Sequence, residues 1–138
     1  MKKKFKAMVL SCIDPRFQSL VSNFLKKKKL TGKFSAFTIA GGSIGVTHKK
    51  FKKWHTTFID NLSISIKLHK IEKLIVVNHT DCGAAKIVNE RQEFNSLIEE
   101  NIHKKSFIRI KNEVKKKFPK IKIELYLISL NKKLIKLK

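Results

Sequence analysis

The most strand-like stretch of the chain is KLIVVNHTDCG (residues 73–83), in which a short β-branched apolar run leads directly into polar residues. A short apolar run bounded by turn residues is typical of a buried strand. We therefore expect a strand over 73–79 and a turn over 80–83. His79 ends this strand and Cys82 follows it, so two reactive side chains stand at its carboxyl end.

Two further strands are expected upstream. FKAMVLS (5–11) reads as a short buried strand and runs into CIDPR (12–16), which holds a thiol, a carboxylate and a guanidinium on alternate positions. KFSAFTIA (33–40) reads as another strand, and GGSIG (41–45) reads as a breaker loop.

Helical spacing of apolar residues predicts helices over 17–30 and from about 50 to 69, and a third helix is expected from about 95 to 117. The alternating run 120–130 predicts a further strand, and 134–137 a short strand that folds back on it. Strands that alternate with helices predict an α/β fold with a mostly parallel central sheet of about four to five strands flanked by helices. We expect one domain over 1–138.

The net charge of +22 comes mainly from lysine, because only three of the 32 basic residues are arginine. The lysines are scattered along the chain, whereas sequence readout and bidentate phosphate contacts favour arginine. The abundance of Lys, Ile and Asn is typical of a compositional bias. We expect salt-sensitive, non-specific binding to polyanions rather than a dedicated nucleic-acid site.

The start of the chain, MKKKFKAMVLSC, has an apolar stretch too short for a secretion signal, and no run is long enough to span a membrane. We interpret it as a basic leader into the first strand and expect a cytoplasmic protein. In a reducing compartment, two cysteines indicate metal binding or catalysis more often than a disulfide.

If the strands 5–11 and 73–79 are neighbours in a parallel sheet, Cys12, Asp14, Arg16, His79 and Cys82 meet at one edge of the sheet. Two cysteines and one histidine are ligands suited to Zn2+, and three protein ligands leave a fourth position for water or substrate. Each of these residues alone is more often structural; the set of five favours a site.

Asp14 has two roles open to it, since it either binds the metal or accepts a hydrogen bond from metal-bound water. Arg16 is placed to hold the Asp14 carboxylate away from the metal. Asp81 is interpreted as a turn-former, and Gly83 as the residue that lets the backbone turn past Cys82.

The two elements CIDPR and HTDCG resemble the Cys-x-Asp-x-Arg and His-x-x-Cys-Gly elements of the β-class carbonic anhydrases. The resemblance implies zinc-dependent hydration of carbon dioxide to bicarbonate. It also implies zinc ligands at Cys12, His79 and Cys82, with Asp14 able to become a fourth ligand, a catalytic pair of Asp14 and Arg16, and a homodimer or larger assembly.

Residues 38–42 (TIAGG) match the family's Arg-Asn-Ala-Gly element at Ala40 and Gly41 only. The resemblance therefore implies substrate-binding roles for Ala40 and Gly41. Because this Arg and Asn are missing, a related substrate such as carbonyl sulfide or carbon disulfide is an alternative to carbon dioxide. No N-terminal helical arm is expected, so dimerisation would depend on the core. His48, His55, His69 and His103 are all candidates for proton relay.

Three other interpretations compete with this one. A cysteine-nucleophile phosphatase would need an arginine at position 18, where the chain has Gln18. A non-catalytic polyanion-binding protein that keeps a zinc site would explain the charge and the altered loop. A redox switch through a Cys12–Cys82 disulfide would leave Asp14, Arg16 and His79 without a role.

Overall fold

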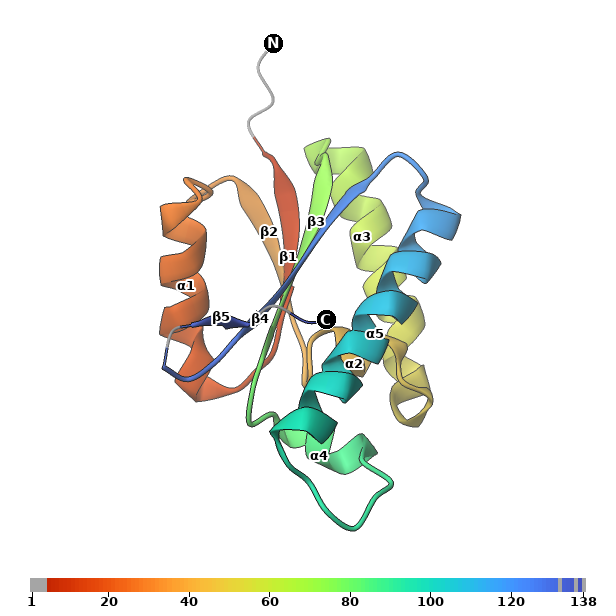
Figure 1. Cartoon of the computed structure of the whole chain (residues 1–138). Helices are drawn as coiled ribbons and strands as arrows, with labels where there is room; N and C mark the ends of the chain where they lie inside the picture. The colour runs from red at the N-terminus through yellow and green to blue at the C-terminus, as the bar shows by residue number, and fades with distance from the viewer. Residues whose placement is uncertain (1–4, 132, 136, 138) are drawn as a thin grey trace.

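The computed structural model describes residues 5–131, 133–135 and 137, and its centre is a five-stranded sheet between two layers of helices (Figure 1). The strand order is β2-β1-β3-β4-β5. The first four strands are parallel, and β5 is antiparallel to β4. This confirms the predicted α/β fold with a mostly parallel sheet. The strands are β1 (Ala7–Ser11), β2 (Phe34–Thr38), β3 (Lys73–His79), β4 (Lys122–Ile128) and β5 (Leu134–Ile135).

Figure 1 shows α1 on one side of the sheet and α2, α3 and α5 on the other, with α4 beyond the end of the sheet. Two short 3₁₀ segments, η1 and η2, precede α1 and α3. The bounds of these elements are η1 (Pro15–Phe17), α1 (Gln18–Lys27), α2 (Ser43–Thr47), η2 (Lys49–Trp54), α3 (His55–His69), α4 (Gly83–Val88) and α5 (Ser96–Lys117).

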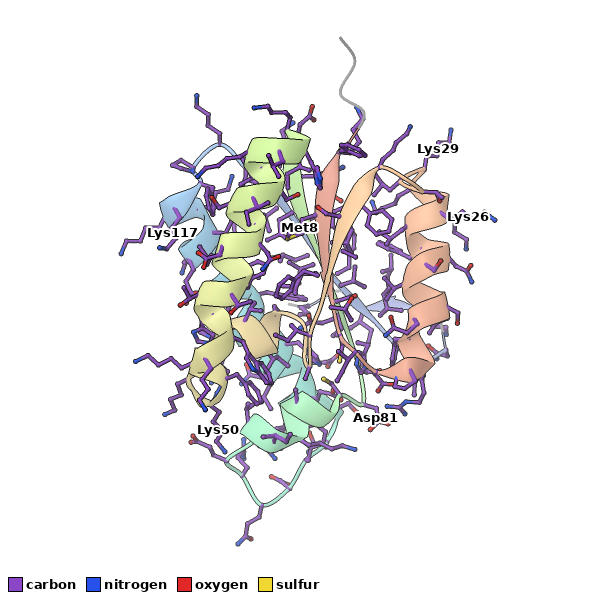
Figure 2. All side chains as sticks on the ribbon, turned by 180° about the vertical axis from the view of Figure 1, so that it is seen from behind. Met8, Lys26, Lys29, Lys50, Asp81 and Lys117 are labelled. Carbon is purple, nitrogen blue, oxygen red and sulfur yellow. The ribbon has the colours of Figure 1, made fainter. Side chains whose placement is uncertain are left out.

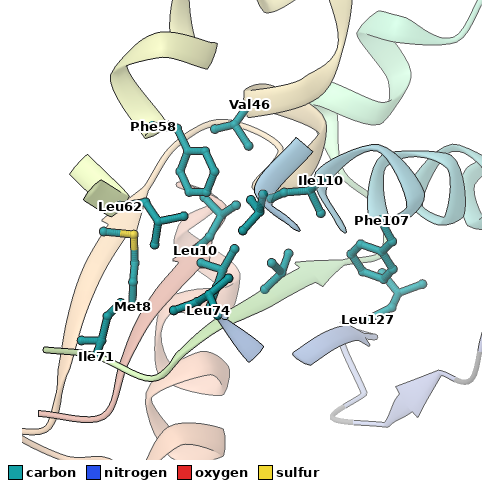
Figure 3. Close-up of a cluster of buried hydrophobic side chains, with 13 residues drawn as sticks. Met8, Leu10, Val46, Phe58, Leu62, Ile71, Leu74, Phe107, Ile110 and Leu127 are labelled. Atoms are coloured by element: carbon teal, nitrogen blue, oxygen red, sulfur yellow. The ribbon is translucent and has the colours of Figure 1, made fainter. Parts of the chain in front are cut away.

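The central strands β1 and β3 are buried along almost their whole length because helices cover both faces of the sheet. Successive side chains of a strand point to opposite faces, so each strand contributes to two cores. Met8, Leu10 and Leu74 pack toward α3 and α5, together with Phe58 and Ile110 (Figure 3). The alternate residues Ala7, Val9, Ile75 and Val77 pack with side chains of α1.

The predicted strands and the three predicted long helices are confirmed, with three differences. The predicted loop 41–45 contains the start of α2, and α4 was not predicted at all. Both are single short helices next to glycines, where local periodicity carries little signal. The predicted helix from about 50 begins as the 3₁₀ segment η2, because Phe51 has non-helical backbone angles.

Some of the sequence predictions concern positions outside the described residues. These are residues 1–4 of the predicted basic leader and position 136 of the predicted strand 134–137, of which β5 covers Leu134 and Ile135. Within the described part of the chain, no helix combines the length and apolar character that crossing a membrane requires. Figure 2 shows Lys26 and Lys29 pointing outward beside α1, and Lys50 and Lys117 pointing outward elsewhere on the molecule, so these lysines are not gathered in one patch.

Candidate metal centre

The parallel pairing of β1 with β3 brings the predicted ligands together. Ser11, the last residue of β1, is aligned with Val77, two residues before the end of β3. Cys12 follows β1, His79 ends β3 and Cys82 precedes α4. Their ligand atoms all lie within 4.8 Å of one another, and all three residues are buried. The expectation that these strands are neighbours is confirmed, and the three residues form one cluster.

One ring nitrogen of His79 forms a hydrogen bond, and the other has no hydrogen-bond partner within the described part of the chain. Its Nδ1 lies 2.7 Å from the carbonyl oxygen of Thr80, to which it donates, so Nε2 carries a lone pair. Phe17 stacks on the imidazole with a centroid distance of 3.9 Å and an interplanar angle of 25°. Among the described residues, Nε2 of His79 is the one buried side-chain nitrogen or oxygen without a hydrogen-bond partner. A bare buried nitrogen beside two thiols is what a metal ligand requires.

The contact between the two thiols moves their pKa values in opposite directions. A hydrogen bond from Cys82, opposed by burial, lowers the pKa of Cys12, and the N–H of Gly41 also donates to the Cys12 sulfur at 3.2 Å. The same contact, together with burial, raises the pKa of Cys82. A second buried thiolate therefore needs a cation beside it. This donor set of two sulfurs and one imidazole nitrogen fits zinc.

Asp14 and Arg16 form a two-pronged ion pair next to the cluster. Nη2 of Arg16 donates to Oδ2 of Asp14 at 2.7 Å, and Nε donates to Oδ1 at 3.1 Å. These hydrogen bonds lower the pKa of Asp14 to about 2, so the carboxylate is ionised at neutral pH. Oδ2 of Asp14 lies 3.9 Å from Nε2 of His79. Arg16 thus holds Asp14 beside the cluster, and the role of Asp14 as a fourth ligand stays a prediction.

Asp81 does more than form the turn that the sequence suggested. Its φ of +55° is in the left-handed region, as a turn-former tolerates. Its side chain also accepts from Nη1 of Arg16 at 2.8 Å, and its carbonyl oxygen accepts from Nη2 at 3.0 Å. Lys86 contacts the other carboxylate oxygen at 2.9 Å. Figure 2 places Asp81 at the end of the sheet beside α4. The guanidinium is therefore fixed from two sides.

Gln18 fixes the loop that carries Cys12 and Asp14. Its side-chain amide donates to the carbonyl oxygens of both residues, at 2.9 Å for Cys12 and 2.8 Å for Asp14. Position 18 therefore serves the loop backbone, whereas the phosphatase interpretation needed an anion-binding arginine there. This structural role of Gln18 was not predicted from the sequence; its place directly after CIDPR was the available signal.

The loop from β2 to α2 brings a backbone donor to the cluster. Gly41, whose N–H contacts the Cys12 sulfur, has a φ of +80°, and a Cβ at this position would lie 2.6 Å from Cβ of Ala84. Only glycine allows the loop to approach α4 this closely. Ala40 is half-buried in the same loop, with its carbonyl oxygen against Gly45. The substrate-binding roles of Ala40 and Gly41 stay predictions.

The four candidate relay histidines lie in different places. His103 is completely buried between Asn78 and Glu99. The ring of His55 contacts the carbonyl oxygen of His48 where η2 meets α3. His69 ends α3 and packs against Phe5, before β1, so it lies at the opposite end of the sheet from the cluster.

Comparison with known proteins places this architecture in one class. The chain is similar in fold to a tetrameric β-carbonic anhydrase of Sordaria macrospora, with a TM-score of 0.62 and 9% identity, covering 99% of this chain and 82% of the other. It is also similar to the β-carbonic anhydrase CcaA, with a TM-score of 0.59 and 13% identity, covering 97% and 80% of the two chains. The fold is that of the β-carbonic anhydrases.

A family model described as "Putative carbonic anhydrase" matches residues 1–133, and the chain belongs to this family. Two curated relatives, uncharacterized proteins of Rickettsia conorii and Rickettsia bellii, are each 26% identical over 125 residues. The match covers 90% of this chain in both cases, and 67% and 76% of the respective relatives.

Proposed function

We propose that this protein catalyses the zinc-dependent, reversible hydration of carbon dioxide to bicarbonate. The observation that carries the proposal is the buried cluster of Cys12, His79 and Cys82, in which His79 presents a bare Nε2 beside the ion-paired Asp14. Membership of the carbonic anhydrase family supports the same reaction.

Cys12, His79 and Cys82 would hold the zinc as two thiolates and one neutral imidazole, which together balance the charge of the ion. Zinc at such a site lowers the pKa of a bound water to about 7, which makes hydroxide available at neutral pH. The apolar side chains of Ile44, Ala84 and Val88 pack around the two cysteines and keep the surroundings dry.

Asp14 is proposed as the hydrogen-bond acceptor that orients the attacking water. An ionised carboxylate accepts but does not donate, so it fixes the direction in which the O–H of the water points. Arg16 holds this carboxylate through two of its nitrogens, and Asp81 holds Arg16 from the other side. The catalytic pair would therefore be rigid before substrate arrives.

We also propose a homodimer or larger assembly in the cytoplasm. The Sordaria macrospora structures are described as tetrameric, which supports an assembly of several chains. Both cysteines are free, which suits a reducing compartment.

A second candidate substrate is carbonyl sulfide or carbon disulfide. Thr38 and Ile39 stand where the family's polar Arg and Asn are expected, so the loop that ends in Gly41 offers fewer polar side chains to the substrate. A related molecule with the same linear geometry suits such a loop. A third alternative is that the protein keeps the metal site but has no enzymatic activity and binds polyanions.

The test combines metal analysis of the purified protein with stopped-flow hydration of carbon dioxide. We expect about one zinc per chain and measurable hydration. Zinc without hydration would direct the assay to carbonyl sulfide and carbon disulfide, and inactivity on all three would favour the polyanion-binding alternative. Failure of the reduced protein to bind supplied zinc would refute the metal centre itself.

A further inference from the structure

A buried carboxylate that the proposed reaction does not use lies directly behind the metal centre. Glu99, in the first turn of α5, is 5% exposed. Its Oε1 accepts from the N–H of Asp81 at 2.9 Å, and its Oε2 accepts from the N–H of Cys82, also at 2.9 Å. One side chain from a distant helix therefore holds both peptide groups of the turn that carries a predicted ligand.

Glu99 meets hydrogen-bond donors on both of its carboxylate oxygens. Oε1 faces the N–H of Asp81, and Oε2 faces both the N–H of Cys82 and Nε2 of His103. The turn, with Asp81 in the left-handed region, is thus held by one side chain that contacts two consecutive N–H groups.

A chain of buried polar groups fixes the orientation of Glu99. The N–H of Ser43 donates to Oδ1 of Asn78, so the NH₂ group of Asn78 must face Nδ1 of His103, at 2.9 Å. Nδ1 therefore accepts, and the proton of the neutral imidazole sits on Nε2, 3.2 Å from Oε2 of Glu99. His103 can only donate to Glu99 in this arrangement.

The network of buried polar groups continues to the loop between β2 and α2, called here the glycine loop, which contains Gly41 and Gly42. The NH₂ group of Asn78 also donates to Oγ of Ser43, which shares a hydrogen bond with Ser106. Ser43 directly follows Gly41 and Gly42, and Gly41 contacts the Cys12 sulfur. The turn that carries Cys82 and the loop that contacts Cys12 are thus joined by one hydrogen-bond network, in which every donor faces an acceptor.

We propose that Glu99 is a positioning residue of the metal centre, which fixes Cys82 as a ligand and, through Asp81, fixes Arg16 against Asp14. His103, Asn78 and Ser43 lock its carboxylate in place. The proposal rests on the metal site of the proposed function but not on its substrate, because its tests follow the metal and the fold rather than hydration.

The decisive variant is Glu99→Gln. The amide has a single acceptor oxygen, so in either orientation its NH₂ group faces the N–H of Asp81 or of Cys82. We expect zinc affinity, measured by competition with a chelator, to fall about 10- to 100-fold. The absorption spectrum of the cobalt(II)-loaded protein should also shift, because it reports the geometry of the thiolate ligands. Glu113→Gln, an exposed position on the same helix, is the matched control and should change neither quantity.

The variant His103→Gln separates positioning from stability. Its amide can still donate to Glu99 but no longer contacts Asn78 as the ring does, so we expect a lower melting temperature with a cobalt spectrum close to that of the unaltered protein. The proposal is overturned if Glu99→Gln keeps the unaltered zinc affinity and spectrum. It is also overturned if the spectra of both variants change in step with their melting temperatures.

A measurement on the unaltered protein decides the matter if Glu99→Gln does not fold. The ¹⁵N shifts of His103 in NMR should report a proton on Nε2 and a lone pair on Nδ1; a proton on Nδ1 overturns the network. An unaltered protein that binds neither cobalt nor zinc refutes the metal centre and this proposal with it. One that binds metal but does not hydrate carbon dioxide refutes the proposed reaction alone.

Discussion

Arg16 has the most demanding position in the site, because its planar guanidinium contacts two carboxylates at once. Three of its nitrogens are engaged, by the side chains of Asp14 and Asp81 and by the carbonyl oxygen of Asp81. Lysine offers a single ammonium on a flexible stem and cannot reproduce this fork. The pairing of Asp14 with Arg16 was expected from their spacing, whereas the contact with Asp81 depends on the strand pairing that brings residue 81 next to residue 16.

Replacement of Asp14 by Asn tests the acceptor role directly. The amide keeps the size of the side chain but loses the ionised acceptor, so we expect about one zinc per chain and a hydration rate lower by about 10²- to 10⁴-fold. Metal analysis and stopped-flow hydration of the same preparation measure both quantities. Normal turnover in Asp14→Asn would show that the carboxylate does not orient the water.

Replacement of Arg16 by Gln should return the pKa of Asp14 from about 2 toward its ordinary value. A carboxyl group with a lowered folded-state pKa adds stability above its unfolded pKa, and this stability disappears as the pH falls through the folded-state value. The stability lost in Arg16→Gln should therefore be constant above about pH 5 and vanish toward about pH 2. Urea unfolding of the two metal-free proteins across this range measures it; a difference that persists to the acid end would contradict the assigned pairing.

At the scale of elements, the glycine loop before α2 is built to fit against β3. Gly42 has a φ of +55°, and a Cβ there would lie 2.6 Å from Oδ1 of Asn78. Asn78 is itself held by two hydrogen bonds to Ser43. Its side chain therefore cannot move away from a Cβ at position 42 without breaking these hydrogen bonds. The loop and the strand are therefore matched to each other.

Gly42→Ala should destabilise the protein more than Gly32→Ala. Both positions have positive φ, at which alanine costs about 1–2 kcal/mol. A methyl group at Gly32 would have nothing within 4 Å, whereas a methyl group at Gly42 would meet Asn78 and should add about 1–3 kcal/mol. Urea unfolding of the two variants gives the comparison. Equal losses would mean that the loop can move away from Asn78 at no cost.

The helices at 17–30 and 50–69 were predictable because their apolar residues recur at helical spacing, and the strand at 73–79 because it is a short, β-branched apolar run bounded by turn residues. The short helices α2 and α4 were missed because each spans too few residues to show a period. Glu99 was also missed, although a signal was present. Phe107 and Ile110 define the buried face of α5, and steps of four residues back from Phe107 reach His103 and Glu99, which places both polar side chains on the inner face.

For the whole molecule, the positive charge behaves as a property of the surface rather than of a site. Lysines on α1, near η2 and at the end of α5 point outward in different directions (Figure 2). We expect a dispersed charge of this size to attract polyanions through release of counterions, without readout of their sequence.

Binding to DNA should therefore be weak, equal for unrelated sequences and steeply dependent on salt. We expect affinity to fall by orders of magnitude between about 50 and 200 mM salt. Fluorescence anisotropy with two unrelated duplexes of equal length measures this. A clear preference for one duplex, or affinity that survives high salt, would instead support a dedicated polyanion-binding function.

The pairing of β1 with β3 also has a consequence for how the chain reaches its native state. Ala7 aligns with Lys73, so these neighbouring strands are separated by helices and an edge strand in the sequence. Contacts of such high sequence separation require closure of a long loop and form slowly. We therefore expect Cys12 and His79 to come together late in folding, unlike the nearby ligands of a zinc finger. A zinc ion bound at this site would therefore slow unfolding and leave the folding rate nearly unchanged.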